Sequence, residues 1–188
     1  MNVHRCELAG LLIIEPKVFG DARGYFLETW NERRYHEVGL EARFVQDNLS
    51  SSRRGILRGL HLQNPNPQGK LLQVLQGEVF DVAVDLRRGS PTFKRWHGLT
   101  LSDQNKRQFY IPPGFAHGFA VLSEMALFHY KCTAFYSPAD EISIRWNDPE
   151  IGVQWPLKEP LLSDRDAKAI PLREVPEDRL LVFNKAGQ

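Results

Sequence analysis

The sequence predicts a mainly β domain, built as a sandwich or barrel, and three observations support this prediction. Short apolar runs recur along the middle of the chain, and 14 glycines and 12 prolines are scattered between them. The run 77–86 has the two-residue alternation of a half-buried strand. The chain has 188 residues, 42% of them hydrophobic, which is enough for one domain with its own core. Many short strands in one domain favour a sandwich or a barrel.

The strand at 77–86 has one apolar and one acidic face. The apolar face carries Phe80, Val82, Val84 and Leu86. Asp81 and Asp85 lie on the other face. Further strands are predicted at 11–14, 43–47, 56–63, 70–76, 93–101, 107–111, 118–122, 126–136 and 141–146.

Helix signals are weak and peripheral. They predict one helix at 30–38 and a short one after Ser163. Prolines interrupt the last quarter of the chain, at positions 149, 156, 160 and 171. We therefore expect a single domain over residues 1–188, in which a C-terminal extension from about 150 to 188 packs on the barrel as loops and short helices.

Composition excludes several kinds of partner. Lys and Arg total 24 against 23 Asp and Glu, so the net charge of +1 gives no argument for nucleic acid or an anionic membrane. The apolar stretches are too short to span a bilayer, and the N-terminal residues lack the apolar core of a signal peptide. Two cysteines, Cys6 and Cys132, are too few for a disulfide framework and are expected to be reduced. The sequence thus predicts a cytoplasmic protein.

The predicted strand 126–136 has one face without formal charge. That face carries Phe128, Tyr130, Cys132, Ala134 and Tyr136, and we expect it to point inward. The hydroxyl of Tyr130 then needs a partner. Two interpretations fit: a core tyrosine with a satisfied hydroxyl, or a phenol that lines a cavity and serves as a general acid.

A tight corner, Pro112-Pro113-Gly114, precedes His117. Its Pro-x-Gly-x-x-His spacing resembles the second motif of the cupin superfamily, whose fold is a small jelly-roll or double-stranded β-helix barrel. Metal-binding cupins add a His-x-His pair on an earlier strand, where this chain has His61-Leu62-Gln63. One isolated imidazole is a poor transition-metal site, so no metal is expected.

Several blocks, in order along residues 1–172, resemble the dTDP-4-dehydrorhamnose 3,5-epimerase family. These blocks are 19–28, 44–48, 55–63, 68–71, 77–85, 111–119, 130–133 and 162–166, and the strongest is Gly55-Ile56-Leu57-Arg58-Gly59-Leu60-His61-Leu62-Gln63. The resemblance implies a cupin barrel that needs no metal or other cofactor and works as a homodimer. It also implies inversion of C3 and C5 of dTDP-4-dehydro-6-deoxy-D-glucose, in dTDP-L-rhamnose synthesis for cell-surface sugars such as O-antigen.

The resemblance assigns four catalytic residues. His61 matches the base, and an unperturbed imidazole pKa near 6.5 suits that task. Asp166 matches a carboxylate that orients His61, although Ser163 to Asp166 also has the pattern of a helix cap. Tyr130 matches the general acid on the opposite face of the sugar. Lys70 matches a lysine beside the C4 oxygen, although a lysine after Gly69 is also typical of a solvated turn.

The resemblance also assigns substrate-binding residues. Arginine forks and amides suit a diphosphate, and Arg23, Arg58, Gln46, Asp47 and Asn48 fall in the matching blocks. Glu28 matches a residue that reads the thymine across the dimer interface. His117 matches a contact to sugar or phosphate, and Glu141 and Arg165 match nucleotide or phosphate contacts. Phe26 and Tyr136 are candidates for stacking on the base.

Two features depart from a simple match. Leu49 and Ser51 stand where typical members have His and Arg, which predicts weaker phosphate binding or altered sugar contacts. In a straight strand Arg58 and His61 point to opposite faces, yet both are assigned to one pocket. A bulge at Gly59 reconciles them.

Two other functions compete with the 3,5-epimerase. A relative that inverts only C3 shares the base, the lysine and the ketone chemistry, so the sequence does not separate the two. A non-catalytic cupin that binds a nucleotide sugar is less favoured, because binding alone needs no acid and base pair.

Overall fold

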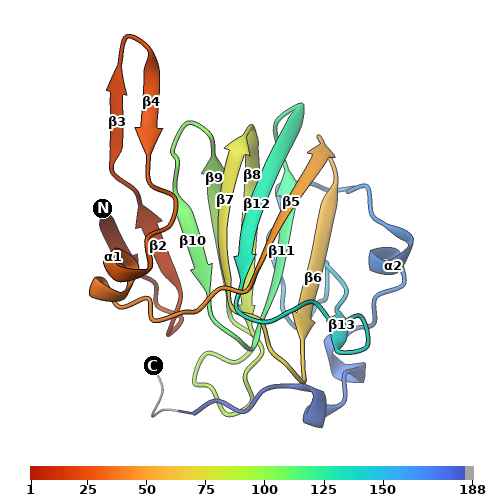
Figure 1. Ribbon diagram of the computed structural model, residues 1–188. Helices are drawn as coiled ribbons and strands as arrows, with labels where there is room; N and C mark the ends of the chain where they lie inside the picture. The colour runs from red at the N-terminus through yellow and green to blue at the C-terminus, as the bar shows by residue number, and fades with distance from the viewer. Residues whose placement is uncertain (185–188) are drawn as a thin grey trace.

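A computed structural model describes residues 1–184 as two antiparallel sheets facing each other, with a separate hairpin (Figure 1). The six-stranded sheet has the order β1 (Asn2–Arg5), β2 (Leu12–Glu15), β10 (Gln108–Ile111), β7 (Lys70–Gln76), β12 (Met125–Cys132), β5 (Gln46–Arg53). The five-stranded sheet has the order β13 (Glu141–Ser143), β6 (Leu57–Gln63), β11 (Phe115–Val121), β8 (Glu78–Asp85), β9 (Trp96–Ser102). The predicted mainly β, jelly-roll class is confirmed.

The remaining elements are short. Strands β3 (Val18–Asp21) and β4 (Gly24–Leu27) form the hairpin, which stands apart from both sheets in Figure 1. The helices are α1 (Glu32–Glu37) and α2 (Asp164–Ala167), with 3-10 turns at Leu172–Glu174 and Glu177–Arg179. In the described part of the chain, no helix has the length and apolar content needed to cross a membrane.

The main core lies between the two sheets. Phe128 of β12 stacks on Phe119 of β11 with ring centroids 4.2 Å apart, so one aromatic pair joins the sheets. Residues of β7, β8 and β10 complete this cluster. The face of β12 that was predicted to point inward does so at Phe128 and Cys132, each 1% exposed.

Strand β8 corrects one prediction, because both of its faces are buried. Val79 and Ala83 join the core between the sheets, and Asp81 and Asp85 share that face with no exposure. The opposite, apolar face packs in a second core under the C-terminal segment, with Ile151, Leu172, Val175 and Leu180. The alternation of residue types was correct, but it did not reveal that other parts of the chain cover both faces of the strand.

Some strand boundaries also differ from the prediction. The strand predicted at 43–47 runs instead over Gln46–Arg53, and the one predicted at 126–136 ends at Cys132. Strand β1 and the β3–β4 hairpin were not predicted. The full length of β5 was not predicted because its inward side chains, at positions 46, 48, 50 and 52, are all polar and give no alternating apolar pattern.

Candidate active site

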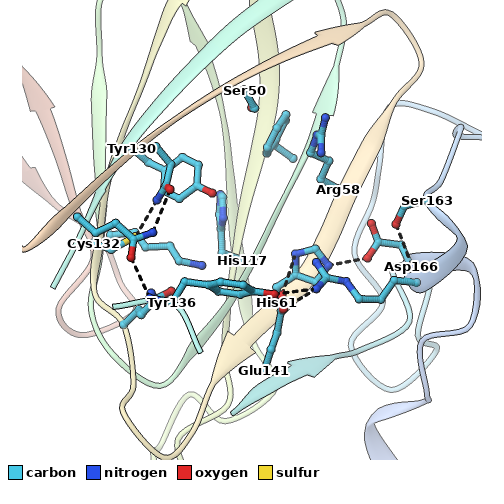
Figure 2. Close-up of a pocket in the computed structure, with 16 residues that line it drawn as sticks. Ser50, Arg58, His61, His117, Tyr130, Cys132, Tyr136, Glu141, Ser163 and Asp166 are labelled. Atoms are coloured by element: carbon cyan, nitrogen blue, oxygen red, sulfur yellow. Dashed lines mark hydrogen bonds and ion pairs between the residues drawn. The ribbon is translucent and has the colours of Figure 1, made fainter. Parts of the chain in front are cut away.

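A cavity of about 470 Å³ opens between the two sheets, and most of the predicted site residues line it (Figure 2). Strands β5, β6, β7, β11, β12 and β13 and helix α2 all contribute to its wall. The predicted residues among the lining are Gln46, Asn48, Arg58, His61, Lys70, His117, Tyr130, Tyr136, Glu141, Arg165 and Asp166.

His61 and Asp166 form a close pair at the cavity wall. The Nε2 atom of His61 lies 2.5 Å from Oδ1 of Asp166, and the Asp166 side chain is only 3% exposed. Burial is the largest single influence and opposes ionisation of this carboxyl. The hydrogen bond and the charge of His61, together with hydrogen bonds from Ser163 and the backbone of Gly59, outweigh burial and hold the pKa of Asp166 below its usual range. Ser163 caps α2 by accepting from the backbone N–H of Asp166. Both interpretations of this segment, cap and dyad, therefore agree with the structure.

A bulge in β6 brings Arg58 and His61 to the same cavity. His117 of β11 pairs with His61 and Phe119 pairs with Arg58, so three steps on β6 oppose two on β11. Gly59 has φ 131°, and a Cβ there would lie 2.6 Å from Cα of Gly118. The predicted bulge at Gly59 is confirmed, and only glycine fits that position.

His117 pairs with a carboxylate that the sequence analysis did not assign to the site. Its Nε2 lies 2.9 Å from Oδ2 of Asp81, which is fully buried. Oδ1 of Asp81 has no hydrogen-bond partner in residues 1–184. Burial raises the pKa of Asp81 and lowers that of His117, so burial disfavours the charged form of both groups.

Lys70 starts β7 and points into the cavity rather than into a solvated turn. Burial lowers the pKa of its ammonium, while the negative charges of Glu141 and Asp81 act in the opposite direction. A desolvated ammonium interacts strongly with any anion that enters the cavity.

The Tyr130 side chain is partly buried in the cavity wall, and burial raises the pKa of its phenol. Its hydroxyl makes none of the hydrogen bonds found among residues 1–184, unlike that of Tyr35, which bonds Gln108 at 2.7 Å. Tyr130 therefore matches the cavity-lining interpretation rather than that of a satisfied core tyrosine.

Tyr136, Glu141 and Arg165 form a polar cluster beside His61. The Tyr136 hydroxyl donates to Oε2 of Glu141 at 2.6 Å, and Nη1 of Arg165 donates to the same oxygen at 2.5 Å. The other oxygen, Oε1, lies 3.9 Å from Nδ1 of His61. Figure 2 shows Tyr136 and Glu141 on the side of His61 that faces away from Asp166.

Four predicted binding residues do not line the cavity. Arg23 pairs with Asp21 at the tip of the hairpin, and Phe26 is 68% exposed on β4. The carboxylate of Glu28 accepts from Asn31 and Arg34. Asp47 pairs with Lys131 and alternates with the cavity-lining positions of β5. Leu49 and Ser51 alternate in the same way and are exposed, so they are not part of this cavity.

The sequence analysis missed several residues of the wall. Ser50, Gln68, Phe119, Cys132 and Ser163 line the cavity. The Ser50 hydroxyl is buried without a partner in the described chain. Of these residues, Ser50 could have been predicted from the polar side chains that recur at every second position of β5. Residues 1–184 contain no group of three or more His, Cys, Asp or Glu side chains placed to hold a metal ion.

Comparison with known proteins identifies the family. The family model described as dTDP-4-dehydrorhamnose 3,5-epimerase matches residues 5–174. The dTDP-4-dehydrorhamnose 3,5-epimerase of Methanothermobacter thermautotrophicus is 54% identical over 175 residues, which is 92% of this chain and 95% of the relative. A dTDP-4-dehydrorhamnose 3-epimerase from Streptomyces niveus is 39% identical over 183 residues, covering 96% of this chain and 88% of that protein.

A solved structure agrees in fold over nearly the whole chain. It is the dTDP-6-deoxy-D-glucose-3,5-epimerase of Legionella pneumophila in complex with dTDP-4-keto-L-rhamnose, and it superposes with a TM-score of 0.95 at 52% identity. The match covers 97% of this chain and 98% of that one. The chain therefore belongs to the dTDP-4-dehydrorhamnose 3,5-epimerase family, a family of isomerases.

Proposed function

We propose that this cavity epimerises C3 and C5 of dTDP-4-dehydro-6-deoxy-D-glucose, with His61 as the base and Tyr130 as the acid. The positions of His61 and Tyr130 in the fold support this assignment of roles. His61 comes from the five-stranded sheet and Tyr130 from the six-stranded sheet, and both line one cavity. Inversion at a carbon needs proton removal on one face and proton delivery on the other.

The C4 ketone makes the protons at C3 and C5 acidic. His61 removes one of them, the C–H electron pair moves toward the C4 oxygen, and an enolate forms. Lys70 is placed to stabilise that oxygen as it gains charge. Asp166 remains ionised beside the imidazole and stabilises its protonated form.

Tyr130 then delivers its proton to the opposite face of the same carbon, and the ketone reforms. Its raised pKa keeps the phenol protonated at neutral pH, as an acid requires. Solvent returns a proton to Tyr130 and takes one from His61, which resets both groups. Repetition at the second carbon gives dTDP-4-dehydro-L-rhamnose.

The same proposal assigns the nucleotide to the outer part of the cavity. Arg58 is held by Ser52, at 3.1 Å from its Nε and 3.0 Å from its Nη2, and stays directed at the cavity for the diphosphate. Gln46 and Asn48 are joined by a hydrogen bond of 3.0 Å and offer amide groups to the same anion. The ring of Tyr136 is placed to stack on the base.

A second copy of the chain completes the site in this proposal. Arg23, Phe26 and Glu28 lie on or next to the hairpin, which projects from the sheets (Figure 1). The hairpin carries exposed aromatic side chains. A homodimer in which the hairpin reaches the partner's cavity places Glu28 near the thymine. We further propose a single domain, whose segment from about residue 150 covers the barrel, and a cytoplasmic location, consistent with the free thiols of Cys6 and Cys132.

The test is deuterium incorporation. The chain is incubated in D₂O with the 4-keto-6-deoxy sugar nucleotide, and C3 and C5 are followed by NMR. We expect deuterium and inversion at both carbons. Exchange and inversion at C3 alone identify the alternative, a C3-only epimerase. Binding without exchange at either carbon identifies a non-catalytic nucleotide-sugar protein.

A further inference from the structure

We propose that Glu141 is a positioning residue for the base His61, and that Arg165 masks its charge until a diphosphate draws the guanidinium away. This inference rests on the proposed function, because it takes His61 to be the catalytic base. It departs from the role that the family resemblance implies for Glu141, because a carboxylate repels a phosphate.

The first step of the argument is geometric. The side chain of Glu141 is 11% exposed and that of His61 is 19% exposed, so both groups are largely shielded from solvent. Oε1 of Glu141 lies 3.9 Å from Nδ1 of His61, while Asp166 occupies Nε2 on the other side of the ring. The imidazole therefore has a carboxylate near each nitrogen. Only Nε2 is within hydrogen-bond distance of its carboxylate, so Nδ1 is the nitrogen left to meet the substrate.

The second step concerns the partners of Glu141. Its Oε2 accepts from both Tyr136 and Arg165, and this cluster raises the pKa of the Tyr136 phenol, with the hydrogen bond to Glu141 as the largest cause. The cation at 2.5 Å offsets the negative charge that His61 meets. Arg165 is half-exposed and lines the cavity, so an incoming diphosphate competes with Glu141 for it.

The third step is the full charge environment of His61. Five elements besides β6 and one loop bring ionisable groups to the same cavity. They are Lys70 on β7, His117 on β11, Tyr130 and Cys132 on β12, Glu141 on β13, Arg165 and Asp166 on α2, Tyr136 from the loop before β13, and Arg58 on β6 itself. Asp81 of β8 lies behind His117. Among the ion pairs of residues 1–184, His61 has only Asp166 and Glu141 as partners. Removal of Arg165 from Glu141 therefore changes the field at Nδ1 directly.

The test follows the titration of the His61 ring by NMR in four proteins: wild type, Glu141→Gln, Arg165→Gln and the double variant. An opposite charge within about 4–6 Å moves a titration midpoint by roughly 1 pH unit or more. We expect Glu141→Gln to lower the midpoint, Arg165→Gln to raise it, and the effect of Glu141→Gln to be larger when Arg165 is absent. Asp140→Asn, at the neighbouring carboxylate that bonds Asn66, serves as the matched control and is expected to leave the midpoint in place.

A second arm uses dTDP as the probe. If the diphosphate draws Arg165 away, dTDP widens the difference in midpoint between wild type and Glu141→Gln. If Glu141→Gln leaves the His61 midpoint unchanged, both with Arg165 present and in the Arg165→Gln background, the positioning role is overturned. If dTDP leaves the difference in midpoint between wild type and Glu141→Gln unchanged, the masking by Arg165 is overturned. Both readouts are independent of turnover, so they remain decisive even if the deuterium experiment rejects the proposed function.

Discussion

The cavity contains two histidine–carboxylate pairs that differ in their access to solvent. His61 and Asp166 meet where a strand and the first turn of α2 come together, and the histidine side chain is 19% exposed. His117 and Asp81 lie on the adjacent strands β11 and β8, with side-chain exposures of 9% and 0%. The same two residue types therefore occupy sites of different polarity.

The difference separates a group that changes charge from a group that holds a position. Asp166 has a lowered pKa and stays ionised, so His61 can take up a proton during turnover. At the other pair, burial raises the pKa of Asp81 and lowers that of His117, so further charging there is unfavourable. These differences support our proposal that His61 transfers protons, and we propose that His117 keeps a fixed hydrogen bond.

The largest expected effect compares the two histidines. His61→Asn is expected to lower kcat by about 10²–10⁴-fold, the usual contribution of a general base, while dTDP binding survives on the arginines. His117→Asn removes a hydrogen bond and is expected to lower kcat by roughly tenfold or less. Steady-state kinetics and calorimetric binding of dTDP measure both. Half the wild-type kcat in His61→Asn, or an equal loss in the two variants, contradicts the division of roles.

The next effect concerns Asp166, the carboxylate that pairs with His61. Asp166→Asn is expected to lower kcat by roughly 10- to 100-fold, the range for loss of a hydrogen bond to a charged group. The helix cap persists, because Ser163 accepts from the backbone N–H of residue 166, which this substitution keeps. Unchanged kcat together with a lower melting temperature shows that Asp166 contributes to the stability of the capped helix and not to catalysis.

A smaller effect is the pH dependence of stability, which has opposite signs at the two carboxylates. The lowered pKa of Asp166 gives stability that is present above about pH 3.9 and is lost as pH falls through the folded-state pKa. The raised pKa of Asp81 gives the reverse, a cost that appears as pH rises from about 3.9 through the folded-state pKa.

Urea unfolding between pH 3 and pH 8 measures this contrast. Relative to wild type, the free energy of unfolding of Asp166→Asn is expected to fall as pH rises, and that of Asp81→Asn is expected to increase. If the free energies of unfolding of the two variants, relative to wild type, change with pH in the same direction, the opposite pKa shifts assigned to the two carboxylates are contradicted.

The smallest expected effect is that of metal removal. Exhaustive chelation is expected to leave kcat unchanged, because the histidines lack the spacing of a cupin metal site. Assays before and after treatment with EDTA provide the measurement. Loss of turnover that a divalent ion restores shows that a metal takes part.

The sequence predicted the fold and much of the site where local pattern and packing agree. The uncharged face of β12 predicted that Tyr130 points inward, and Gly59 predicted the bulge that brings Arg58 to His61. The pairing of His117 with Asp81 was missed, because an acidic face on a strand is normally a solvated face. Whether such a face is covered depends on segments far away in the chain, here the opposite sheet.

The binding residues on the hairpin show a second limit. Arg23, Phe26 and Glu28 were assigned by resemblance, and no periodicity within the chain indicates where they lie. In this chain they lie outside the cavity, and the hairpin strands lack the alternating apolar pattern that predicts a strand. The role proposed for them needs contacts with a second copy, which a single sequence does not encode as a local pattern.

The most direct test of the central claim, a base and an acid on opposing sheets, is the Tyr130→Phe variant in D₂O. The change removes one oxygen and keeps the ring that packs on Phe128. His61 can still remove a proton and return deuterium to the same face. We predict deuterium incorporation at C3 or C5 with retention of configuration, while inverted product falls by a large factor. Normal inversion at both carbons in this variant contradicts the account and assigns the acid to another group or to water.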